Sequence, residues 1–341
     1  MKKILIYFSG FLMIFFIIPA ICTITPPKAQ ETLATTDTQK TQEETVEPQN
    51  TEYDYQKYKT IKLLHLSTGQ VEELNIDEYL YGVVSSEMPA SFELEALKAQ
   101  ALVARTYTIY QINNNKGKHE NEDICTDFNC CQAWISKEEM MAKWAPEDAE
   151  NYWNKIVQAV DETKGKAIAY NGQVINAFFH ANSGGITESS LNIWGGIDYP
   201  YLKSVETAGE EGYTQYASKV TLSHQDLLNK IQEKYQDCDI DFSGQDCIKI
   251  IDYTTSGRVK TIKFGNKEIA GTEARTLLGL KSANFTFTIS AENVTFTVTG
   301  YGHGVGMSQT GADALAKTGA NYEEIIKHYY TDVEIIEVNS L

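Results

Sequence analysis

A helix that starts after a proline break constrains the fold of this chain more than any other feature. Pro89 disfavours helical backbone at Met88. The segment from about Glu93 to Ile112 is then rich in Ala, Leu, Gln, Lys and Glu, which are good helix formers. Apolar residues recur in it at helical spacing, which indicates a face buried in a core. We therefore expect a long helix here that follows a sharp break and packs against the core.

One carboxylate, Glu87, lies at this break among apolar neighbours. Burial disfavours the charged form of a carboxyl group and raises its pKa, which suits proton donation near neutral pH. In the helix that follows, Lys98 and Arg105 are seven residues apart and point the same way. Glu87 is therefore a candidate general acid, with two basic residues behind it in the sequence. The alternative is that all three are solvated surface charges.

Length and net charge limit the classes of function. The chain has 341 residues and a formal net charge of −17. This length leaves room for one large domain or two modest ones. Proteins that bind nucleic acid present a basic surface, so we expect no nucleic-acid partner. An acidic protein suits a neutral polysaccharide better than an anionic wall polymer.

Residues 1–24 have the composition of a membrane segment. Lys2 and Lys3 precede an apolar run from Ile4 to Ile24, which Pro19 interrupts. The run approaches the roughly 20 residues that span a bilayer. Because no small-x-small cleavage site follows, an uncleaved anchor is favoured over a signal peptide. The two lysines then stay in the cytoplasm, and the rest of the chain is exported.

The remaining chain is expected to form a tether and one folded domain. Residues 25–58 are rich in Thr, Gln, Glu and Pro, and they cannot bury enough apolar surface to fold, which predicts a flexible linker. Residues 59–341 mix hairpins and helices without regular βαβ alternation. This pattern indicates an α+β fold, as an elongated domain of one or two lobes.

Local signals fix several elements of that domain. A hairpin is predicted around Gly69, and a second one turns at Asn171-Gly172. Asp77 is expected to cap a helix that runs to about Ser85. A capping box, Asn321 with Glu324, starts the last helix. Further helices are expected at 137–143, 147–163, 309–317 and 322–330.

Four potential metal ligands lie within 13 positions of one another: His119, Cys125, Cys130 and Cys131. Zinc binds four such ligands around one point, and a Cys₃His set with no open position would be structural. Disulfides are the chief rival in an exported protein. Three cysteines cannot pair among themselves without one left over, whereas Cys238 and Cys247 are a separate pair that could bridge a loop. From the residues alone, zinc and thiols or disulfides remain open.

Two glycine-rich loops contain histidines, at Phe179–Gly185 and Gly300–Gln309. The second has four glycines, but no Lys-Ser/Thr pair follows them, so it is no phosphate loop. Glycine lets a backbone approach a ligand closely. The first loop lacks the G-x-S-x-G elbow of serine hydrolases. We assign four side chains to a ligand-binding groove opposite Glu87, which the family resemblance described next implies to be a glycan-binding groove, with hydrogen-bonded turn residues as the alternative: His180, Ser183, His303 and Gln309.

These two loops and the segment Ser86–Phe92 resemble the stage II sporulation protein D family, and the resemblance spans residues 77–335. Members of that family are known as lytic transglycosylases of spore-forming bacteria that act on glycan strands during forespore engulfment. Relatives enhance cell-wall amidases. The resemblance implies that Glu87 is the catalytic acid, and that a zinc site follows the catalytic helix. Tyr301 stands where many members have Trp, which concerns only the detail of the groove.

The resemblance also implies a mechanism. Glycosidases generally use two carboxylates, whereas here Glu87 would protonate the bond between N-acetylmuramic acid and N-acetylglucosamine, and the muramic 6-hydroxyl would attack. The product is a 1,6-anhydro end, and Lys98 and Arg105 would orient the substrate or set the electric field at Glu87. The expected substrate is glycan stripped of stem peptides, and the expected partners are a cell-wall amidase and a membrane scaffold of the engulfment machinery. The domain would lie outside the mother-cell cytoplasm.

Two alternatives to a transglycosylase remain. One is a non-enzymatic glycan binder that activates an amidase, which would not need an acidic Glu87. The other is a zinc amidase that acts through the cysteine–histidine cluster. An amidase needs an open metal position, and a closed Cys₃His site argues against it.

Overall fold

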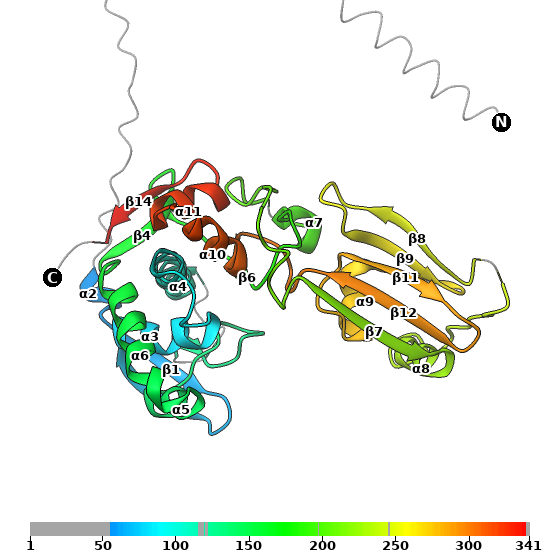
Figure 1. Cartoon of the computed structure of the whole chain (residues 1–341), viewed down its shortest axis with the longest axis horizontal. Coiled ribbons are helices and arrows are strands. Elements are labelled where there is room, and N and C mark those ends of the chain that lie inside the picture. Colours follow the sequence, from blue (N-terminus) through cyan, green and yellow to red (C-terminus); the bar gives the residue numbers. More distant parts are fainter. Residues whose placement is uncertain (1–54, 115–118, 120–121, 197, 245, 339–341) are drawn as a thin grey trace, which may run out of the picture. The chain divides into compact units, whose positions relative to one another are not determined.

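The computed structural model describes residues 55–114, 119, 122–196, 198–244 and 246–338 (Figure 1). The anchor expected at residues 1–24 lies outside the described residues, and so does most of the tether expected at 25–58. The last four tether residues form the short helix α2 (Tyr55–Tyr58), and Tyr58 is buried in the core. Within the described ranges, no helix combines the length and the apolar character that a membrane span requires.

Helix α4 (Leu94–Asn114) is the centre of the first hydrophobic core. Every residue from Ala99 to Ile109 is buried, so the helix is covered on all sides and not on one face as its periodicity predicts. Small alanines let neighbouring elements approach closely. The elements that contact it include α3 (Ile76–Glu87), α6 (Pro146–Asp161), β4 (Lys166–Tyr170), α10 (Gln309–Lys317) and α11 (Tyr322–Tyr329) (Figure 1).

Two small sheets flank this core, and both predicted hairpins are confirmed. Strands β1 (Thr60–His65) and β2 (Gln70–Asn75) pair antiparallel, and β3 (Ile124–Cys125) joins β1 in parallel. Strand β4 turns at Asn171-Gly172 into β5 (Gln173–Val174), and both turn residues have positive φ. Strand β14 (Glu334–Glu337) pairs with the other edge of β4.

The helix caps show where local signals were right and where they were wrong. The capping box of Asn321 and Glu324 is confirmed at the start of α11. Helix α5 (Lys137–Lys143) also begins at its predicted residue. The cap predicted at Asp77 is wrong, because Asn75 caps α3 by accepting a hydrogen bond from the Asp77 N–H at 2.9 Å. The Asp77 side chain instead turns inward and pairs with Arg105.

The chain between the two glycine-rich loops forms a second hydrophobic core. One three-stranded antiparallel sheet has the order β11-β12-β7, and the other has the order β10-β9-β8. Helices α8 and α9 contact these strands. The bounds are β7 (Ala217–Ser223), α8 (His224–Gln232), β8 (Ile248–Tyr253), β9 (Val259–Phe264), β10 (Lys267–Ala270), α9 (Gly271–Leu278), β11 (Phe285–Ile289) and β12 (Asn293–Thr299). The predicted α+β class is therefore confirmed, with two cores.

The two glycine-rich loops meet although they are more than 100 residues apart. Strand β6 (Phe179–His180) pairs in parallel with β13 (Met307–Ser308), and a bridge joins Asn182 to Tyr301. A Cβ added at Gly306, whose φ is +72°, would lie 2.0 Å from the Phe178 carbonyl oxygen. This glycine therefore lets two parts of the protein backbone approach each other, not a ligand.

Candidate active site

Glu87 is the last residue of α3, and Met88 follows it in extended backbone as Pro89 requires. Its Oε1 accepts a hydrogen bond from the Ala133 N–H at 2.8 Å, and its Oε2 accepts one from Gln309 Nε2 at 3.3 Å. Desolvation raises the pKa of Glu87, and these two hydrogen bonds act in the opposite direction. The carboxyl group is thus held in a fixed orientation and its protonated form is favoured, as a general acid requires.

Gln309 is one assigned residue that the structure brings to Glu87. It is the first residue of α10, and its Nε2 also lies 3.4 Å from Gln100 Oε1 on α4. Glu87 and Gln309 are 222 positions apart, so no local pattern shows their contact. Gln100 lies in α4, and sequence reasoning missed it because an amide in a helix carries no distinctive signal.

Lys98 and Arg105 point the same way, but toward the C-terminal end of α6. Lys98 pairs with Glu95 at 2.6 Å and with Glu162 at 2.5 Å. Arg105 is fully buried, pairs with Asp77 at 3.1 Å, and donates to the carbonyl oxygen of Thr163 at 2.6 Å. These contacts hold α3, α4 and α6 together. We therefore leave Lys98 and Arg105 out of the proposed substrate groove.

The two assigned histidines are neighbours on the joined loops, with ring centroids 5.6 Å apart. His180 is buried, and its Nδ1–H donates to the Val305 carbonyl oxygen at 3.1 Å. His303 Nδ1 accepts from the Val305 N–H at 3.0 Å. Desolvation lowers the pKa of His180 to about 3 and lowers the pKa of His303 well below its usual value. Both rings are therefore neutral at pH 7, which suits packing and hydrogen bonding better than proton transfer.

Ser183 is fully buried and belongs to an internal network around Glu210. Its hydroxyl and its N–H both donate to the Glu210 carboxylate, which also accepts from the hydroxyls of Ser308 and Thr310 and from the Gly185 N–H. Glu210 is itself fully buried. Sequence reasoning missed it, because nothing near Glu210 in the chain indicates that five donors converge on it. The network joins the first loop to the start of α10 and so positions Gln309.

Replacing Glu210 by Gln is expected to lower the free energy of unfolding by roughly 3 kcal/mol, because buried donors would lose a charged acceptor. Urea unfolding followed by circular dichroism measures the change. The matched control is Glu211→Gln, which removes the neighbouring exposed carboxylate and should shift stability little. Equal stability of the two variants would contradict the role given to Glu210.

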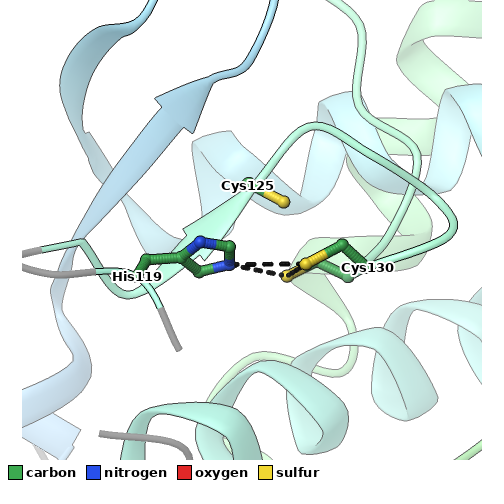
Figure 2. A group of neighbouring side chains, drawn as sticks. His119, Cys125 and Cys130 are labelled. Carbon is green, nitrogen blue, oxygen red and sulfur yellow. Dashed lines mark hydrogen bonds between the residues drawn. The ribbon is translucent and has the colours of Figure 1, made fainter. Parts of the chain in front are cut away.

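The four cysteine and histidine residues converge on one point, as Figure 2 shows for the three that it labels. His119 Nε2 lies 3.4 Å from Cys131 Sγ and 3.6 Å from Cys130 Sγ, and the two sulfurs are 3.8 Å apart. All four ligand atoms, that of Cys125 included, lie within 4.8 Å of one another. A disulfide has sulfurs about 2.05 Å apart. Around zinc, with bonds of about 2.3 Å to sulfur and 2.0 Å to nitrogen, tetrahedral edges are about 3.8 and 3.5 Å. The distances among His119, Cys130 and Cys131 thus fit zinc.

This cluster adjoins the candidate acid through the backbone. Cys125 lies on β3, which pairs with β1, and the segment continues through Cys130 and Cys131 to Ala133. The Ala133 N–H is the group that binds Glu87 Oε1. A metal at the cluster would therefore fix the loop that orients the carboxylate.

Comparison with known proteins shows the family to which this chain is related. A family model described as Stage II sporulation protein matches residues 65–170. The chain is 35% identical over 283 residues to stage II sporulation protein D of Bacillus amyloliquefaciens, and the alignment covers 82% of this chain and 80% of that protein. The chain belongs to the stage II sporulation protein D family. Stage II sporulation protein D of Bacillus subtilis matches with the same identity and coverage.

A second kind of relative shares this similarity. The amidase enhancer of Bacillus subtilis is 29% identical over 299 residues, which covers 74% of this chain and 39% of that protein. In the present chain, residues 65–170, which match the family model, include Glu87 and the cysteine–histidine cluster. The glycine-rich loops lie outside the matched segment, and the tertiary structure brings one of them to Glu87 through Gln309.

Proposed function

We propose that this sporulation-family protein is a lytic transglycosylase that cleaves denuded peptidoglycan strands during engulfment, with Glu87 as its acid. The observation that carries the proposal is the environment of the Glu87 carboxyl group. Desolvation raises its pKa, and two hydrogen-bond donors fix its orientation. A single acid suffices when the substrate supplies its own nucleophile. The family membership supports a role in sporulation.

In the proposed reaction, Glu87 donates its proton to the glycosidic oxygen as the bond from C1 of N-acetylmuramic acid breaks. The muramic 6-hydroxyl oxygen then bonds to C1, and its proton passes to Glu87. No water is consumed, the acid is regenerated, and the product is a 1,6-anhydro end. The hydrogen bonds from Ala133 and Gln309 would stabilise the transient carboxylate, while desolvation favours the acid before the reaction.

For the substrate groove, we favour Gln309, which is buried but contacts Glu87, and the half-buried ring of His303 over the other assigned residues. His180 and Ser183 are buried and would support the loops from behind. For the metal, we propose one structural zinc ion at His119, Cys125, Cys130 and Cys131, because the donor types and their spacing fit it. Bound there, zinc would cross-link the polar loop that ends at Ala133.

We further propose that residues 1–24 anchor the protein in the membrane, and that the domain works outside the mother-cell cytoplasm. Stem peptides would be removed beforehand by a cell-wall amidase, with a membrane scaffold of the engulfment machinery as a second partner. The similarity to the amidase enhancer supports a second candidate function, a glycan binder that activates such an amidase without cleaving glycan itself.

Mass spectrometry of products from purified denuded strands decides between these functions. A transglycosylase is expected to release fragments with 1,6-anhydro ends and no added water. Reducing ends would show hydrolysis and contradict the proposed chemistry. Intact strands, together with faster peptide release by an added amidase, would establish the activator instead.

A further inference from the structure

A pocket of about 550 Å³ lies where helix α7 (Ser190–Trp194), the second glycine-rich loop and helix α9 meet. Trp194 lines it and is 48% exposed, with its ring centroid 4.6 Å from that of Phe178 and 5.3 Å from that of His303. The indole is thus held by its neighbours while much of it faces solvent. An exposed aromatic face fixed in a concave site is suited to stacking against a ring-shaped ligand.

The wall of this pocket carries an arginine that has no hydrogen-bond or ion-pair partner in the part of the chain that the structure describes. The chain has three arginines. Arg105 and Arg258 are buried and donate to backbone carbonyl oxygens, Arg258 to those of Ser183 and Ile186. Arg275 lines the pocket, and it forms no side-chain hydrogen bond or ion pair with any residue of the described ranges. A partly buried guanidinium group without an anion is costly, so this position favours an anionic ligand.

The other two charged side chains of the pocket, Lys234 and Glu273, neutralise each other. Glu273 pairs with Lys234 at 2.5 Å and also accepts a hydrogen bond from Tyr235 at 2.8 Å. The His303 ring is neutral at pH 7, because desolvation lowers its pKa. Arg275 therefore leaves one net positive charge in the pocket of a protein whose formal net charge is −17.

The pocket connects to the candidate acid along the joined loops. The His303 ring, in the pocket wall, contacts the ring of His180. His180 pairs with Ser308 across the β6–β13 ladder. Gln309 follows Ser308 and binds Glu87. These contacts, through the buried residues His180, Ser308 and Gln309, join the pocket wall to the site of Glu87 within the protein interior.

Resting on the proposed function, we propose that this pocket is a subsite for a muramic acid residue whose lactyl carboxylate is free, and that Arg275 determines this specificity. The sugar ring would stack on Trp194, and the guanidinium fork would bind the carboxylate through two parallel hydrogen bonds. In a strand that still carries stem peptides, the lactyl group is a neutral amide with a bulky substituent. The reaction that supplies the substrate must therefore be amide hydrolysis, in which water adds across the bond and leaves a carboxylate.

Calorimetric binding to the full-length Glu87→Gln chain in detergent tests this inference, because that chain should not consume its ligand. Two glycans are compared, one with free lactyl carboxylates and the same one converted to methylamides. We expect the carboxylate form to bind at least about tenfold more tightly, as a charge-assisted pair lost to the amide would require. Adding Arg275→Gln should remove this preference and leave the affinity for the methylamide unchanged.

Two further variants control for charge and fold. Arg275→Lys should keep part of the preference, because the charge remains while the planar fork is lost. Lys219→Gln, at an exposed position on β7, changes net charge equally and should keep the whole preference. A preference that survives Arg275→Gln, or no preference in the chain with Arg275 intact, would overturn the inference. Because binding is measured without cleavage, a preference lost with Arg275 would stand even if the wild-type protein cut no glycan.

Discussion

Replacing Glu87 by Gln is expected to reduce glycan cleavage at least about 1,000-fold while the fold and glycan binding are kept. Gln has nearly the same shape and can still accept the hydrogen bond from the Ala133 N–H, but its amide has no acidic proton to transfer to the glycosidic oxygen. Release of 1,6-anhydro fragments from denuded strands measures the loss. The matched control is Glu93→Gln, an exposed carboxylate six positions away, which should retain full activity. Full activity of the Glu87→Gln variant would refute the single-acid mechanism.

The pH dependence of the wild-type protein gives a second measurement on the same residue. Because desolvation raises the pKa of Glu87, its protonated form is favoured by the fold. Its contribution to stability is present at low pH and is lost as pH rises through the folded pKa. Gln is neutral throughout, so the melting temperature of the variant relative to wild type should increase with pH. Over the same range the wild-type cleavage rate should fall. A difference in melting temperature between variant and wild type that is the same at every pH would show that Glu87 is not desolvated.

Removing zinc is expected to lower the melting temperature by about 10 °C and to reduce cleavage indirectly. A closed site of three thiolates and one imidazole adds folding free energy, because no such site exists in the unfolded chain. Without the metal, the loop from His119 to Ala133 loses its cross-link, and the Ala133 N–H no longer fixes Glu87. Cys125→Ser should have the same two effects.

Elemental analysis of protein purified under reducing conditions measures the metal directly, with one equivalent of zinc expected. Cys238→Ser provides the control, because Cys238 is buried in the second core and belongs to no metal cluster among the described residues. That variant should keep its zinc even where its stability falls. Less than about a tenth of an equivalent of zinc in a fully active wild-type protein would show that the cluster holds no structural metal.

The sequence alone determined the features that depend on a few neighbouring residues. Pro89 ends α3 because its ring restricts the residue before it, and Glu87 is consequently placed at the helix end. Asn171-Gly172 fixes a hairpin, and Asn321 with Glu324 fixes a cap, since each involves backbone groups at most three positions away. The prediction failed at Asp77 although the signal was local, because the preceding Asn75 competes for the same cap.

Only the tertiary structure decided which polar side chains are buried and what they contact. Arg105 and Ser183 resemble site residues in the sequence, yet elements far along the chain cover them and supply their partners. The glycine-rich loop marked Gln309 as a site residue, but only the fold shows its contact with Glu87. Arg275 carries no local signal, and the fold places it in a pocket wall without a partner among the described residues. The physical reason is that desolvation and pairing depend on every group packed around a side chain, whereas helix breaks, turns and caps depend on backbone preferences within one turn of chain.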